Sequence, residues 1–301
     1  MRICSFLPSA TEILYALGAG QCVAGVTFEC DFPAHARTKP VVVRTTLASG
    51  LTPQEIEDAV RAQVAAGGTL YVADQQMLEQ LQPDLVITQD LCRVCAIGAD
   101  DLAQVLAHLR PPPQVLSLEP HLLEDVLRSI TLVGEAIGRA PEAQFLVDSL
   151  RERVERVKAA RPLRRPRVLC LEWLAPLYQG GHWVPEMVHI AGGEPVLAMA
   201  GEKSVPLPWD QVREADPEVL VVMPCGFHLD ETVAQYRAAT FPGWWQQMAA
   251  VRAGQVYAVD GTAYFSRPGP RLVDGIEILQ AILAGHGLDD LPAGSVLRLN
   301  D

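Results

Sequence analysis

The chain has little of what marks nucleic-acid-binding and membrane-spanning proteins. It carries 24 lysines and arginines against 36 aspartates and glutamates, which gives a formal net charge of -12. Duplex nucleic acid binds basic surfaces, so this balance argues against nucleic acid as a partner. No apolar run approaches the ~20 residues that a membrane helix requires, so we expect no membrane insertion either.

The common catalytic and nucleotide-binding motifs are absent as well. The sequence contains no G-x-S-x-G elbow, no P-loop lysine, no H-E-x-x-H and no G-x-G-x-x-G. A Cys–His nucleophilic pair forms in space and not in sequence, so that one catalytic possibility stays open. We predict that the protein is not an enzyme.

The N-terminus does not show the order of a secretion signal. Its first residues, MRICSFLPSATEILYAL, lead from Met1 directly into an apolar strand. Seven cysteines, an odd number in a chain of this length, indicate reduced thiols. We expect a cytoplasmic protein as the sequence stands, and a periplasmic or extracellular one if a leader has been removed.

What the sequence does contain is a regular alternation of strands and helices. Apolar strands are predicted at residues 3–6, 23–27, 40–45, 84–88, 115–118, 167–171, 219–223 and 255–259, with helical patterns between most of them. Ser9 and Glu12 predict a capping box that opens the first helix at Glu12, and residues 172–183 are predicted as a long loop. This alternation is typical of parallel βαβ units.

One long helix is predicted near the middle, over residues 141–160. Leu146, Leu150, Val154 and Val157 recur there at spacings of three and four. Twenty residues at ~1.5 Å each make a rod of roughly 30 Å, long enough to span two lobes. The alternative is an ordinary surface helix within a single sheet domain.

We therefore predict an α/β fold of two Rossmann-like lobes with parallel sheets, joined by one long helix, with a ligand cleft between the lobes. The predicted parts are an N-terminal lobe over residues 1–139, the connecting helix over 140–162 and a C-terminal lobe over 163–301.

Candidate binding residues follow the predicted strands, because ligands of open parallel sheets bind beyond the carboxyl ends of the strands. These polar and aromatic residues are Glu29, Cys30, Gln89, Asp90, Cys92, Tyr178, His182, Trp183, Phe227, Tyr264, Phe265 and Arg267. Arg267 and Arg271 would hold amide or phosphate groups of a ligand; the alternative is a structural role in the RPGPR turn.

Four of the cysteines follow strands: Cys30, Cys92, Cys95 and Cys225, of which the middle two form C-x-x-C. A helix N-terminus favours the thiolate, which is the form that binds metal. Such thiols could hold zinc or an iron–sulfur cluster, or they could form a redox dithiol or stay unreacted.

Two further pairs of residues have simpler predictions. His182 and Glu186, four residues apart, would share one helix face and suit a metal. The alternative is that His182 caps the helix or lines the cleft and that Glu186 faces water. Cys4 and Cys170 lie in strand interiors and are predicted as plain core residues.

A family resemblance is carried by blocks that occur in order over nearly the whole chain. They are LPSATEILYALGAG at 7–20, GVTFECDFP at 25–33, LQPDLVITQ at 81–89, PWDQV at 208–212, ADPEVLVV at 215–222 and VYAVDGTAYFSRPGPRLVDG at 256–275. The chain resembles the helical-backbone class of substrate-binding proteins of ABC importers, and more specifically the cobalamin-binding BtuF family.

This resemblance implies a ligand and a partner. Tyr178, Tyr264 and Phe265 fall where the family places aromatic side chains against the corrin ring, whereas Glu29 and Gln89 stand where its cobalamin binders tend to have aromatic residues. The implied ligand is cobalamin, a related corrinoid or another metal chelate.

The family docks on its permease through one acidic residue per lobe. Asp210 falls on the second-lobe position, and Gln76, with Asp74 and Glu79 nearby, falls on the first. The rival hypotheses are a cytoplasmic metal, iron–sulfur or redox protein that uses the four cysteines, and an enzyme that modifies a corrinoid or related chelate.

Overall fold

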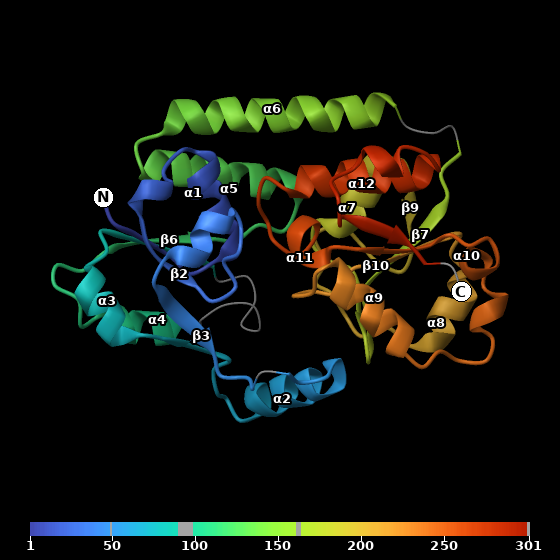
Figure 1. Cartoon of the computed structure of the whole chain (residues 1–301), viewed down its shortest axis with the longest axis horizontal. Helices are drawn as coiled ribbons and strands as arrows, with labels where there is room; N and C mark the ends of the chain where they lie inside the picture. Colours follow the sequence, from blue (N-terminus) through green and yellow to red (C-terminus); the bar gives the residue numbers. More distant parts are fainter. Residues whose placement is uncertain (49, 90–98, 161–163, 300–301) are drawn as a thin grey trace. The chain divides into compact units, whose positions relative to one another are not determined.

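The computed structural model describes residues 1–48, 50–89, 99–160 and 164–299 (Figure 1). These residues form two compact units. The first comprises Met1–Pro120 and Glu124–Asp148, and the second comprises His121–Leu123 and Ser149–Asp301. The predicted two-lobe α/β architecture is confirmed, whereas the three-part boundaries and the ligand cleft between the lobes stay predictions.

The first unit is built on a six-stranded sheet with the order β4-β3-β2-β1-β5-β6. All neighbours pair in parallel except β3 and β4, which are antiparallel. The strands are β1 Ile3–Ser5, β2 Val23–Thr27, β3 Val41–Thr45, β4 Tyr71–Ala73, β5 Leu85–Gln89 and β6 Gln114–Leu118. Because β1, β2, β5 and β6 run in one direction, the loops that follow them share one edge of the sheet.

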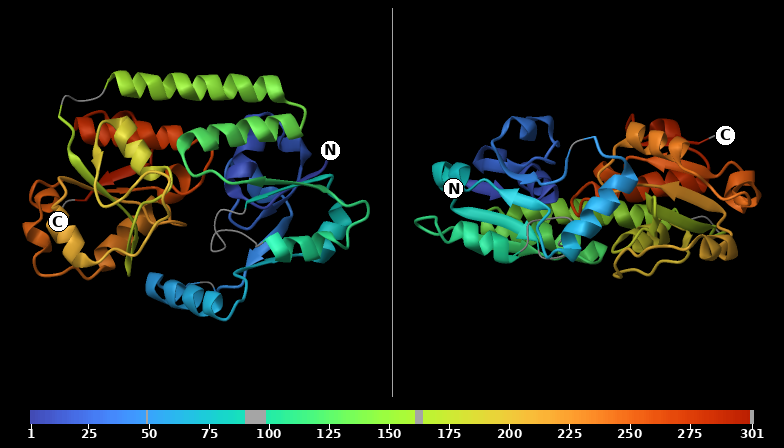
Figure 2. Two further views of the ribbon diagram at one scale, coloured as in Figure 1. Left: turned by 180° about the vertical axis from the view of Figure 1, so that it is seen from behind. Right: turned by 90° about the horizontal axis from the view of Figure 1, so that it is seen from below.

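Helices cover both faces of this sheet. Helices α1 and α5 lie on one face, and α3 and α4 lie on the other (Figures 1 and 2). The helices of this half are α1 Pro8–Ala16, α2 Pro53–Ala65, α3 Gln75–Leu81, α4 Ala99–Leu106 and α5 Leu123–Ala136, with 3-10 turns at η1 Gly20–Cys22 and η2 Ala34–Thr38. The sandwich arrangement buries the apolar strands, as parallel sheets require.

The first helix does not begin as the sequence predicted. It starts at Pro8, and its N-cap, Leu7, makes no side-chain capping bond. Ser9 and Glu12 lie inside the helix and are buried, so the predicted capping box is wrong. Proline suits the first turn because its missing N–H would have had no partner there.

The second unit is built on a sheet with the order β12-β11-β10-β7-β8, to which β9 is added along β7. Its strands are β7 Arg167–Leu174, β8 Leu177–Gln179, β9 Glu194–Pro195, β10 Val219–Val222, β11 Val256–Val259 and β12 Val296–Arg298. Strands β7, β10 and β11 are parallel, whereas β8 and β12 are antiparallel to their neighbours. Residues 172–183, predicted as a long loop, thus contain a tight β7–β8 hairpin.

Helices also cover both faces of the second sheet. Helices α7 and α12 lie on one face, with α8, α9 and α10 on the other (Figures 1 and 2). The helices are α7 Val184–Ala191, α8 Trp209–Ala215, α9 Leu229–Ala238, α10 Ala249–Arg252, α11 Gly261–Tyr264 and α12 Leu272–Ala284, with 3-10 turns at η3 Trp245–Gln247 and η4 Leu288–Asp290. Of the helices that the structure describes, none combines the length and apolarity that crossing a membrane requires.

The long helix α6, Ala140–Ala159, contains the boundary between the units, which falls after Asp148. Leu150, Val154 and Val157 are buried as predicted, whereas Leu146 is only half-buried. In its second half Arg153 donates to Glu277 of α12 at 2.6 and 2.9 Å, and to Asp274 of the same helix. These bonds fix the second half of α6 on the second unit.

Candidate functional site

The loops after β10 and β11 are bonded to each other at the carboxyl edge of the second sheet. His228 Nδ1 lies 2.8 Å from Asp260 Oδ2, and the other oxygen of Asp260 accepts from Ala263 N at 2.7 Å, which caps α11. Thr262 N also donates to Phe227 O. Parallel strands bring these loops to one edge, and the side-chain bonds lock them together.

Gly261 allows the close approach of these two loops. A Cβ at this position would lie 2.5 Å from Pro224 O and 2.8 Å from Met223 O. Both are backbone atoms that cannot rotate away, so a residue without a side chain is required here.

Aromatic side chains gather at the same edge. The rings of Trp173 and Phe227 lie 5.5 Å apart between centres, and the guanidinium of Arg271 lies 5.8 Å from the centre of the Tyr264 ring. All three aromatic residues are half-buried, as is Tyr178 in β8. Partly exposed rings of this kind offer area to a flat apolar ligand.

Three of the predicted site residues lie beneath this surface. Phe265, Trp183 and Arg267 are 1%, 5% and 9% exposed, and Trp183 Nε1 donates to Phe265 O at 2.7 Å. In this conformation they support the loop and offer little area to a ligand. The burial of Arg267 favours the structural alternative for that arginine.

Glu172 lies near the end of β7, among the residues whose position after a strand predicts a place at the site. Its Oε2 accepts from Ser204 Oγ at 2.6 Å and from Gly181 N at 3.2 Å. Burial raises the pKa of this carboxyl, and the two hydrogen bonds partly oppose the increase. The side chain ties β7 to the Gly180–Gly181 turn that precedes His182.

His182 and Glu186 do not share a helix face, so that prediction is wrong. Helix α7 begins at Val184, and His182 precedes it with a left-handed backbone, φ 52°. Glu186 Oε2 instead accepts from Leu123 N at 2.9 Å. The His182 ring lies 5.5 Å from the Trp183 ring and 6.1 Å from the His121 ring, between ring centres.

In the first unit, the loop after β2 is the described part of the candidate site. Cys30 is buried, with its Sγ 3.1 Å from Thr11 Oγ1. Phe28 and Phe32 are 41% and 46% exposed. These two phenylalanines are not among the predicted site residues, although FECDFP places them on both sides of Cys30.

The other predicted residues of this unit are less informative. Glu29 is half-buried, and Gln89, the last residue of β5, is 8% exposed. Asp90, Cys92 and Cys95 lie outside the described residues. A small pocket of about 200 Å³ lies beside the β2 loop and includes Phe28, Cys30 and Asp31.

A four-cysteine metal centre gains no support from the described part of the chain. No group of three or more His, Cys, Asp or Glu side chains there could hold a metal. Cys30 is buried in the first unit, whereas Cys225 is exposed in the second. With Cys92 and Cys95 undescribed, the zinc or iron–sulfur centre stays a prediction.

Cys4 and Cys170 are core residues, as predicted. Cys4 is fully buried and Cys170 is 7% exposed. Burial raises the pKa of both thiols to about 12. Neither is a reactive thiolate near neutral pH.

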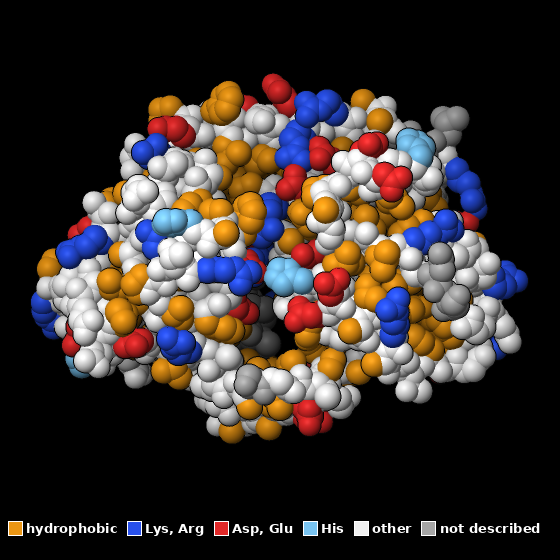
Figure 3. All heavy atoms as spheres, in the orientation of Figure 1, with side chains coloured by type: hydrophobic (Ala, Val, Ile, Leu, Met, Phe, Trp, Pro, Cys, Tyr) orange, Lys and Arg blue, Asp and Glu red, His pale blue; other side chains and the backbone are white. Residues whose placement is uncertain are grey.

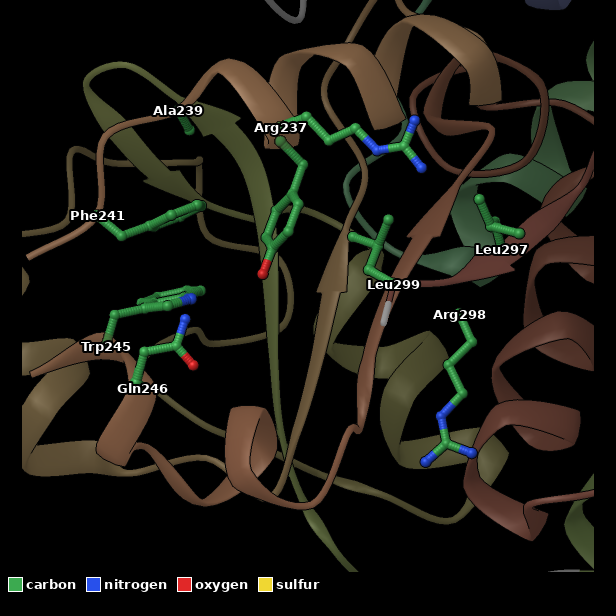
Figure 4. Close-up of a pocket in the computed structure, with 9 residues that line it drawn as sticks. Arg237, Ala239, Phe241, Trp245, Gln246, Leu297, Arg298 and Leu299 are labelled. Atoms are coloured by element: carbon green, nitrogen blue, oxygen red, sulfur yellow. The ribbon is translucent and has the colours of Figure 1, made fainter. Parts of the chain in front are cut away.

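A pocket of about 570 Å³ lies elsewhere in the second unit (Figure 4). It is lined by Tyr236, Arg237, Ala239, Phe241, Trp245, Gln246, Leu297, Arg298 and Leu299. Leu299 N donates to Val256 O, at the start of β11, so this pocket lies at the opposite end of the strand from the Asp260 loop. Its position separates it from the candidate site.

The predicted docking residues are accessible. Asp210 is exposed in the first turn of α8, and Gln76 is exposed in α3. Asp74 caps α3 by accepting from Met77 N at 2.9 Å. Figure 3 shows acidic and basic side chains interspersed over one face of the described residues.

A family model described as "Periplasmic binding protein" matches residues 3–263. The chain belongs to this family. The vitamin B12-binding protein of Vibrio cholerae serotype O1 is 25% identical over 284 residues, which are 92% of this chain and 86% of that protein. The family match and this relative confirm the resemblance that the sequence blocks indicate.

Solved structures of periplasmic binding proteins share the fold. The heme-binding protein RhuT of Roseiflexus sp. RS-1 superimposes with a TM-score of 0.71 at 22% identity, covering 94% of this chain and 98% of that chain. The vitamin B12-binding protein BtuF of Vibrio cholerae gives 0.68 at 20% identity, covering 94% and 96%. The cytoplasmic expectation finds no support, because the matching family model is described as periplasmic.

Proposed function

We propose that this protein is the non-catalytic substrate-binding component of an ABC importer and that its ligand is cobalamin or a related corrinoid. The observation that carries the proposal is a set of half-buried aromatic side chains at the carboxyl edge of the second sheet: Trp173 and Phe227, whose rings lie 5.5 Å apart, and Tyr264 on the next loop. A corrin ring is a large flat macrocycle, which gains most from aromatic contact and apolar burial.

The first unit offers a second apolar surface of the same kind. Phe28 and Phe32 are both exposed, and the Phe28 ring lies 6.4 Å from that of Tyr71. We propose that these phenylalanines take the part that the family's cobalamin binders give to aromatic residues at the Glu29 and Gln89 positions.

Heme is the nearest competing ligand. The names of the relatives divide between vitamin B12 and heme, and both are flat metal macrocycles that aromatic surfaces suit. A direct competition between cobalamin and hemin therefore decides the ligand within the proposed function.

Location and docking follow from the same proposal. We propose the periplasmic or extracellular alternative, with docking on a permease through Asp210 and the Gln76 region, both of which are exposed. The rival based on cysteines is weakened at Cys30, since that thiol is buried against Thr11.

The test is a titration of the pure, ligand-free protein with cyanocobalamin, aquocobalamin and hemin, followed by tryptophan fluorescence. Trp173 is half-buried at the proposed surface, so a bound chromophore should quench it. We expect saturable quenching by a cobalamin, after correction for ligand absorption. Folded protein that binds hemin alone would refute the corrinoid assignment, and binding of neither would refute the proposed function.

Single substitutions locate the ligand on the protein. We expect Tyr264→Ala and Phe227→Ala each to weaken binding by roughly 1–3 kcal/mol, the scale of one buried aromatic contact. Phe145→Ala is the matched control, because this side chain is 78% exposed on α6. Unchanged affinity in both test variants would place the ligand elsewhere.

A further inference from the structure

His182 is held in a conformation that few residues of its type adopt. Its backbone is left-handed, φ 52°, and two hydrogen bonds fix it there. His182 N donates to Glu202 O at 2.6 Å, and Gly201 N donates to His182 O at 2.8 Å. Such strain costs of order 1–3 kcal/mol and concentrates at functional sites.

The fold brings His121 to this ring across a long stretch of sequence. The segment His121–Leu123 groups with the second unit, although its flanking residues belong to the first. Leu123 N donates to Glu186 Oε2 at 2.9 Å, which holds the segment at the first turn of α7. The centre of the His182 ring then lies 6.1 Å from that of His121 and 5.5 Å from that of Trp183.

One nitrogen of this ring has no partner among the residues that the structure describes. Nε2 of His182 is buried and makes no hydrogen bond to any of them. A buried polar atom without a partner is costly, and an ion or water that binds it is a common explanation. Burial, with His121 and Lys203 nearby, lowers the pKa of His182, which favours the neutral ring. Neutral imidazole is the form that binds metal.

We propose that His121 and His182 together bind one divalent transition-metal ion of the zinc, nickel and copper class. At the usual Zn–N distance of about 2.1 Å, two imidazole centres around one metal lie about 5–6.4 Å apart. The observed 6.1 Å falls within that range. Water completes the coordination, since two side chains supply two ligands.

Imidazole donors select this class of metal. Zinc, copper and nickel bind imidazole well, whereas magnesium and calcium prefer oxygen ligands. The nearby Lys203 opposes any cation at the site. The two-histidine site does not depend on the proposed corrinoid function, because its ligand is the metal ion alone.

The test is calorimetric titration of Ni²⁺ into the untagged full chain, treated with chelator and alkylated at its accessible thiols. Alkylation matters because Cys225 is exposed and would compete for the metal. We expect one saturable site per chain. His182→Asn is the best variant of that residue, because asparagine tolerates the left-handed backbone.

His182→Asn and His121→Gln should each lower Ni²⁺ affinity about 100-fold or more, since even second-shell changes cost about 10- to 100-fold. His286→Gln, an exposed histidine on the turn after α12, should leave it unchanged. Lys203→Met should tighten binding. Circular dichroism checks that each variant is folded.

Electron paramagnetic resonance with Cu²⁺ counts the nitrogen donors directly. We expect two imidazole nitrogens in the natural chain and one in His121→Gln. The proposal is overturned if no saturable site is found, if either folded variant keeps full affinity, or if the copper spectrum shows no more than one nitrogen.

Discussion

Gly261→Ala tests whether the close approach of the two loops in the second unit is required. The added Cβ would meet Pro224 O at 2.5 Å and Met223 O at 2.8 Å. Carbon contacts are optimal at about 3.5–4.0 Å, so one loop must move by about 1 Å. Overpacking of this kind costs about 1–3 kcal/mol, and the lower entropy of the unfolded chain returns about 0.4–1 kcal/mol.

We therefore expect Gly261→Ala to lower the free energy of unfolding by about 1–2 kcal/mol. The displacement would also move Phe227 and Tyr264, which lie on the two loops, and should weaken ligand binding. Urea unfolding followed by circular dichroism measures the change in stability, and the fluorescence titration measures the change in affinity.

Gly243→Ala is the matched control. A Cβ there would have no heavy atom within 4 Å, and the backbone is not left-handed. We expect this variant to be unchanged or slightly more stable. If Gly261→Ala proves as stable as Gly243→Ala, the loops are not in the close contact described above.

Two further substitutions test the electrostatics of the second unit. Because burial raises the pKa of the Glu172 carboxyl, its contribution to stability is full below the unfolded pKa of about 4.3 and is lost as pH rises through the folded pKa. Glu172→Gln keeps an acceptor for Ser204 but does not titrate. The free energy of unfolding of this variant, relative to that of the natural chain, should therefore increase from pH 4 to pH 8. An equal dependence on pH in the two proteins, measured by urea unfolding, would contradict this. Arg153→Met should lower the free energy of unfolding by about 1–2 kcal/mol, because it removes the hydrogen bonds to Asp274 and Glu277 on α12. Arg156 is exposed on α6, the helix that also carries Arg153, and Arg156→Met should lower it by less than about 0.5 kcal/mol. Equal losses in the two variants would show that the ion pairs contribute nothing.

The sequence predicted the candidate site only as far as topology allows. Strand ends identify which loops share an edge, and this was enough to select Phe227 and Tyr264. Burial within a loop depends on packing, so Phe265 and Trp183 were selected as ligand residues although the structure buries them. Phe28 was passed over because a single aromatic residue in a loop gives no local signal of exposure.

The sequence by itself determined the alternation of the main parallel strands with helices and the long central helix, because hydrophobic periodicity is a local property that each segment carries alone. It could not show the β7–β8 hairpin, whose short strands hold no repeat to read. Only the tertiary structure decided which distant residues meet: Arg153 with Glu277, 124 positions apart, and His121 with His182. Such pairs depend on how whole helices and strands pack against one another, and residue spacing along the sequence does not predict that packing.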